Sequence, residues 1–187
     1  MAITRRTGPA DGPAVVDRAV RQLMRSEFEA FGSAAAGADS VASTQPIQRF
    51  RLNPGDLAGA DPLAKAAPVG WSYLVVGPGP EPAAVADVGD APAGGAPSFG
   101  SLIRGRMAKR MAAAAQLAAS RYGEGNDHFE VRILEIPAIY ITALWLHGPR
   151  DIFIPFLEGA TKDGDPVSED PSFLSRARDA AKKRQSQ

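Results

Sequence analysis

The chain has 187 residues, and its 21 Lys and Arg balance 21 Asp and Glu, so the formal net charge is zero. This length allows one domain with a substantial core, with or without appendages. A neutral balance argues against a protein devoted to nucleic acid, which usually carries a basic excess. Because the chain has no cysteine, disulfides, thiolate nucleophiles and thiolate metal sites are excluded.

The N-terminal stretch MAITRRTGPADGP has two arginines but no apolar region after them. It therefore lacks the pattern of a secretory signal, and we expect a cytoplasmic protein. Residues 32–43, 53–70 and 89–98 are rich in Ala, Gly and Pro. This composition predicts long surface connections.

The first predicted helix begins at Pro13, a residue suited to a first turn, and ends at Gly32. Its apolar residues recur at helical spacing and form one stripe. The stripe consists of Val16, Ala19, Val20, Leu23, Ala30 and Phe31. Three short strands are predicted next, at 47–52, 71–76 and 83–88, and the loop GPGPEP joins the last two as a hairpin.

A second helix is predicted from a cap at Ser98 to a stop at Gly123. One side carries an apolar stripe that consists of Ile103, Met107, Met111, Ala114, Ala118 and Tyr122. The other side carries Arg106, Lys109 and Arg110. A solvated helix face explains these charges, and contact with nucleic acid or an acidic partner is the alternative.

The segment EIPAIYITALWLHG is the most apolar of the chain. Only 11 residues separate Glu135 from His147, whereas a membrane-spanning helix needs roughly 20. Its β-branched and aromatic residues favour a strand over 138–146, after a strand over 128–136. Since neither face of this strand is polar, we expect a cover on both sides, from this chain or from a second subunit. Residues 152–156 predict a last strand, in which Pro155 suggests an edge position or a strand end.

The pattern predicts an α+β fold, with a mainly antiparallel sheet of about four to five strands packed with two amphipathic helices. Residues 1–157 would form this single domain. Residues 158–187 would form a polar loop and a basic C-terminal segment, in which Asp170 and Pro171 open a possible helix.

A ligand site, if there is one, is expected at the His147 end of the apolar strand. The imidazole of His147, the guanidinium of Arg150 and the carboxylate of Asp151 lie there within five residues. Trp145 and residues 152–156 supply apolar side chains beside them. The candidate ligand-binding residues are Trp71, Tyr73, Tyr140, Trp145, His147, Arg150 and Asp151. Ordinary core packing for the aromatics and a solvated charged turn are the alternative interpretation. No residue spacing predicts a metal site, a catalytic motif or a cofactor.

Two charges fall inside apolar stripes, Glu27 in the first helix and Arg104 in the second. Partly buried charges need partners, so we predict that these two residues form an ion pair. A structural role for this pair is favoured over acid–base work.

The leading functional hypothesis is a non-enzymatic module for protein–protein association. Its partner would be a second copy of the chain or another protein, and we expect no contact with a membrane. This hypothesis follows from the missing catalytic motifs and from the strand that is apolar on both faces. The alternative is a small-molecule-binding protein, or an enzyme, with its site near His147.

Overall fold

The computed structural model describes residues 2–30, 42–76, 82–90, 95–159 and 167–185, without the side chains of 24–30, 42, 82, 83 and 185. These residues divide into two compact units. The first unit consists of Met1–Arg6, Gln48–Val69 and Arg110–Gln187, and the second of Thr7–Ile47 and Gly70–Lys109. Each unit is therefore built from segments that lie far apart in the sequence.

The first unit contains a sheet whose strands run in the order β3-β7-β8-β9, with β1 beside the start of β7. The antiparallel strands β7, β8 and β9 form its centre, whereas β1 and β3 run parallel to β7. The bounds are β1 Ile3–Thr4, β3 Ile47–Arg51, β7 Phe129–Ile136, β8 Ile141–His147 and β9 Ile152–Leu157.

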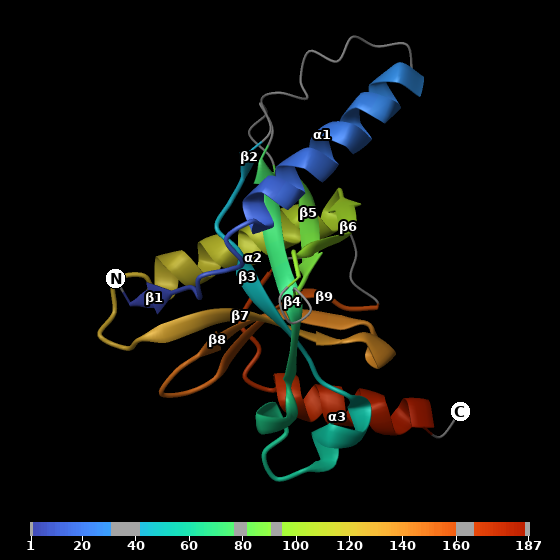
Figure 1. Cartoon of the computed structure of the whole chain (residues 1–187). Coiled ribbons are helices and arrows are strands. Elements are labelled where there is room, and N and C mark those ends of the chain that lie inside the picture. Colours follow the sequence, from blue (N-terminus) through green and yellow to red (C-terminus); the bar gives the residue numbers. More distant parts are fainter. Residues whose placement is uncertain (1, 31–41, 77–81, 91–94, 160–166, 186–187) are drawn as a thin grey trace. The chain divides into compact units, whose positions relative to one another are not determined.

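Helices cover this sheet on both faces: α2 (Arg106–Tyr122) lies on one side of β7, β8 and β9 and α3 (Phe173–Gln185) on the other (Figure 1). Short 3-10 turns η2 (Pro54–Ala58), η3 (Leu63–Lys65) and η4 (Pro137–Ile139) complete the unit. All residues of β8 from Ile141 to Leu146 are buried. The expected cover on both faces of the apolar strand is thus present within the chain itself.

The second unit packs α1 (Gly12–Ala30) against antiparallel strands. These strands are β2 Ala42–Ser43, β4 Ala67–Val76, β5 Pro82–Gly89 and β6 Ser98–Arg104. Val16 and Val20 of α1 join a buried cluster with Trp71 and Tyr73 of β4, as the predicted helical stripe requires.

The α+β class and the mainly antiparallel pairing are confirmed, but the predicted sheet was too small. The described residues contain nine strands and three α-helices, against the expected four to five strands and two helices. The two-residue strands β1 and β2 are too short to show a period in the sequence. The possible C-terminal helix is formed as α3 and belongs to the first unit, whereas the single domain over 1–157 stays a prediction.

The predicted start of the second helix at Ser98 is wrong, because residues 98–104 form β6 and the helix begins at Arg106. Gly105 lies between them with φ +71°, a left-handed conformation that glycine adopts without steric cost. Ile103, assigned to the helical stripe, pairs instead with Val85 of β5. Gly100 and Gly105 inside the supposed helix were the signal against it.

Two further boundaries differ from the prediction. The strand expected from Ala138 begins at Ile141, because η4 and a left-handed Tyr140 (φ 54°) precede it. The connection predicted over 53–70 contains η2, η3 and the start of β4, and it buries Leu57 in the core. The connections predicted over 32–43 and 77–82 lie largely outside the described residues. Of the connection predicted over 89–98, residues 91–94 lie outside them, and its two ends belong to β5 and β6.

Candidate functional site

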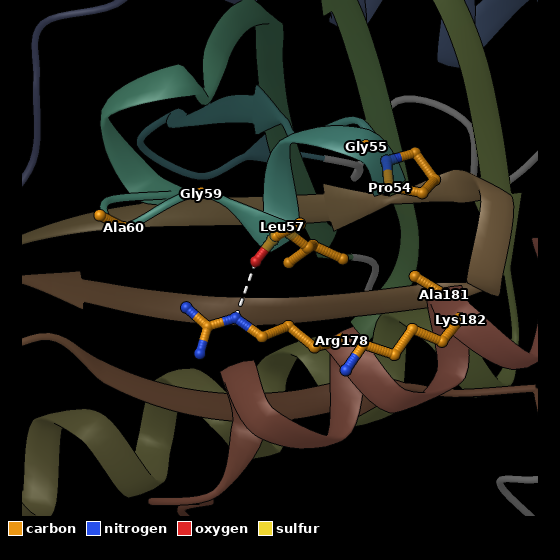
Figure 2. A pocket seen from close by; sticks show the side chains of 9 residues that line it. Pro54, Gly55, Leu57, Gly59, Ala60, Arg178, Ala181 and Lys182 are labelled. Atoms are coloured by element: carbon orange, nitrogen blue, oxygen red, sulfur yellow. Dashed lines mark hydrogen bonds between the residues drawn. The ribbon is translucent and has the colours of Figure 1, made fainter.

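The first unit carries an open hollow of about 640 Å³ between η2, the loop after it and α3 (Figure 2). This volume lies within the range of about 300–1,000 Å³ that is typical of small-molecule sites. The wall consists of Pro54, Gly55, Leu57, Ala58, Gly59, Ala60, Arg178, Ala181 and Lys182.

Buried apolar residues hold the two walls in place. Leu57 of η2 and Ala177 and Ala181 of α3 belong to one core cluster, together with Trp145 of β8. The proline at the start of η2 favours a turn at this point, because its ring fixes φ near the helical value. The hollow is therefore built on packed elements, with short side chains that leave room between them.

Arg178 spans the hollow from α3 to η2. Its Nε donates a hydrogen bond to the carbonyl oxygen of Leu57 at 2.7 Å (Figure 2). Lys182, one helical turn further along α3, is the second cation of the wall. Among the described residues that line this hollow, none is acidic, so its wall is positively charged.

The His147 end of β8 forms a second cluster. Oδ1 of Asp151 accepts a hydrogen bond from Nε1 of Trp145 at 2.7 Å and lies 2.9 Å from Nδ1 of His147. The Trp145 and His147 rings also meet edge to face, with their centroids 5.2 Å apart. The carboxylate of Asp151 thus brings together two other predicted site residues, Trp145 and His147.

A smaller hollow of about 300 Å³ lies beside this cluster. Its wall consists of Leu63, Arg150, Asp151, Ile152, Phe153, Glu169, Asp170, Pro171 and Leu174. Burial alone would raise the pKa of Glu169, but hydrogen bonds with Arg121 and Tyr122 outweigh it and hold the pKa below its usual value. The acids of this wall are largely engaged by the protein itself.

The other predicted site residues lie elsewhere. Trp71 and Tyr73 belong to the core of the second unit, where Nε1 of Trp71 donates to Asp90 at 2.8 Å. Tyr140, expected on a strand, is 62% exposed on a turn, with the Arg184 guanidinium 4.9 Å from its ring centroid. The structure therefore does not gather the four aromatics, and a binding role for each stays a prediction.

The predicted ion pair between Glu27 and Arg104 cannot be followed in full, because the Glu27 side chain lies outside the described residues. Arg104 ends β6 and is exposed, so the expected burial is wrong for this partner. Of the basic residues on α2, Arg110 donates from Nε to the carbonyl oxygen of Phe156 at 2.8 Å. This bond gives Arg110 a structural role, and nucleic-acid contact stays a prediction.

The sequence interpretation missed the larger hollow. It took 53–70 for a surface connection and the C-terminal segment for a basic extension outside the domain. The signal that was available is the pair Arg178 and Lys182, four residues apart and on the side of α3 that also carries buried Ala181. Which segment faces this side could not be read from the sequence.

Within the described ranges, no group of three or more potential ligand side chains could hold a metal ion. None of the helices in the described part combines the length and hydropathy of a membrane-spanning segment. Comparisons with protein-family models, with curated proteins and with solved structures gave no match.

Proposed function

We propose that this protein binds a small molecule in the hollow between η2 and α3. The observation that carries the proposal is the hollow itself, because its volume of about 640 Å³ suits a small molecule and its walls rest on a buried core. Apolar Leu57 and Ala181 offer contact surface, while Arg178 and Lys182 offer polar contacts that orient a ligand.

The association hypothesis has lost its main support, since α2 and α3 cover both faces of β8. Association with another protein stays a prediction, whereas the reason given for a second copy no longer holds, because this chain itself covers β8. The smaller hollow at the His147 end is the second candidate site, because Arg150 and Asp151 line it as the sequence interpretation expected.

Gly55 allows a direct test of the larger hollow. A Cβ atom built at Gly55 meets nothing within 4 Å, so the side chain of Gly55→Phe starts in open space beside the hollow. Small-molecule fragments, charged and neutral, are screened by two-dimensional NMR against the labelled protein. We expect hits to shift the amide signals of Gly55, Gly59 and Ala60, and Gly55→Phe to weaken their affinity by about tenfold or more.

The matched control is Gly125→Phe, at a glycine of the same unit that does not line the hollow and whose added Cβ comes no closer than 4.0 Å to Asp127 N. It should leave the affinity unchanged. Hits that bind Gly55→Phe as tightly as the unchanged protein contradict the proposal. If His147→Ala alone abolishes binding, the site is the smaller hollow instead.

A further inference from the structure

We infer that the ligand of the larger hollow is an anion, a molecule with phosphate or carboxylate groups, and that the Arg178 guanidinium is its principal contact. This inference rests on the proposed function, because it names the class of ligand for the same hollow.

The bonding of Arg178 is the first argument. A guanidinium has five N–H donors in a planar fork, and the one at Nε is used by the Leu57 carbonyl oxygen at 2.7 Å. For the donors on its two terminal nitrogens, the described part of the chain records no acceptor. Arg178 is therefore held in a fixed orientation and keeps the two-pronged end that binds oxyanions.

The partial burial of Arg178 is the second argument. Its side chain is only partly exposed, and its one hydrogen-bond partner among the described residues is the neutral carbonyl group of Leu57. A partly buried cation is stabilised by a nearby negative charge. The contrast on the same helix is Arg176, whose guanidinium pairs with Glu158 and Asp170. A ligand oxyanion would give the Arg178 guanidinium a negatively charged partner, as two carboxylates do for Arg176.

Three acids lie next to lining residues in the sequence, Asp56, Asp61 and Asp179, and none of them lines the hollow. Asp56 of η2 is not among the lining residues, and its Oδ2 accepts from Nδ2 of Asn53 at 3.3 Å. Lys182 lies one helical turn from Arg178 and adds a second positive charge to the wall. A ligand with more than one negative group therefore fits the wall better than a neutral one.

The test is isothermal titration calorimetry on the full chain with pyrophosphate and citrate, and with glycerol as the neutral probe at matched ionic strength. We expect at least one of the two anions to bind, with an affinity that falls as NaCl is added, and glycerol to give no heat of binding. Pyrophosphate and citrate separate a preference for phosphate from one for carboxylate.

Arg178→Gln should weaken anion binding by about tenfold or more, because charge-assisted bonds are lost. The anion affinity of Arg178→Lys should lie between those of the unchanged protein and Arg178→Gln, because lysine keeps the charge but lacks the planar fork of the guanidinium. Lys183→Gln, which removes one charge from an exposed residue of the same helix outside the lining, should bind as the unchanged protein does. Circular dichroism checks that each variant is folded.

The inference is overturned if neither anion binds, or if Arg178→Gln and Lys183→Gln have equal effects. If neutral fragments still bind in the unchanged protein and are lost in Gly55→Phe, the proposed site stands and only its anion specificity falls. If no probe of either kind binds, the proposed function falls as well.

Discussion

Asp170 shows how one side chain fixes the start of a helix. Its Oδ1 accepts from the backbone N–H and the hydroxyl of Ser172, at 2.9 and 2.7 Å, and its Oδ2 accepts from Nε of Arg176 at 2.8 Å. Burial alone would raise the pKa of Asp170, but these bonds and the charge of Arg176 outweigh it and lower the pKa below its usual value. The charged form is therefore favoured by the folded state.

Asp170→Asn should destabilise the protein by roughly 1 kcal/mol at pH 7, because the single amide oxygen of asparagine can keep the cap to Ser172, whereas its NH2 group cannot accept from Arg176. A lowered pKa in the folded state contributes stability that is present above the unfolded value, about 3.9, and is lost as pH falls through the folded value. We therefore expect the difference in Tm between the two proteins to shrink below about pH 4.

Thermal unfolding at pH 7, 5 and 3 measures this difference. The control is Asp179→Asn, at an exposed carboxylate of the same helix, which should show a smaller difference at pH 7. A difference between Asp170→Asn and the unchanged protein that persists at pH 3 would show that the carboxylate charge is not responsible.

Residues close together in the sequence were the predictable part of the candidate sites. Trp145, His147 and Asp151 fall within one strand end and its turn, so their meeting followed from local order alone. Arg178 acts on the carbonyl of Leu57, 121 positions away. Such a contact depends on which loop covers which helix, and no local pattern encodes that.

At the scale of elements, α3 is the cover of one face of β8. Phe173 is 1% exposed and its ring stacks on Phe153 with centroids 4.5 Å apart. Ala177 and Ala181 follow at the spacing of one helix face and are buried in the same cluster. Because the alanine side chains are short, α3 can approach the sheet closely beside Leu57 and Trp145.

Phe173→Ala should destabilise the first unit by roughly 3–5 kcal/mol, the usual cost of removing a buried phenylalanine ring. Urea unfolding measures this, with Ser175→Ala at an exposed position of α3 as the control. The chain has two tryptophans, so a Trp71→Phe background makes Trp145 the only fluorescent reporter. A cost below about 1 kcal/mol, with unchanged Trp145 emission, would show that α3 is not an essential cover.

Elements with a long and clear period were predictable, and those set by pairing were not. The stripe of α1 and the alternation of β7 follow from helical and strand periods. β6 was mistaken for helix because Ile103 fits a helical stripe drawn through Met107 and Met111. The two glycines argue against a helix there, but the pairing with β5, through Val85 and Ala86, is what makes this segment a strand.

At the scale of the molecule, each of the two units combines segments that are not consecutive in the sequence. The first unit draws β1 from the N-terminus to pair with β7, with Ile3 opposite Phe129. The second unit brings β2 to β4, with Ala42 opposite Val76. Long-range pairing of this kind is selected by which buried faces fit together, so a reading of successive segments cannot foresee it.

The fold changes the expected oligomeric state of the protein from a homo-oligomer to a single chain. The sequence interpretation expected a homo-oligomer or another protein partner, because a second subunit was one of the two possible covers for the apolar strand. One face of that strand is covered by α3, and Trp145 is 2% exposed in a single chain. In the described part of the chain, the large apolar side chains that are exposed are Leu23, Val76 and Tyr140, which lie on three different elements or turns.

We therefore expect the mass of one chain by light scattering at micromolar concentration, unchanged on dilution. A stable homodimer usually requires a contiguous apolar patch, and scattered exposed residues do not form one. A mass of two chains would show that a surface other than the faces of β8 joins them. Repeating the measurement with Tyr140→Ser and Val76→Ser would then identify it, because the variant that restores the single-chain mass marks the interface.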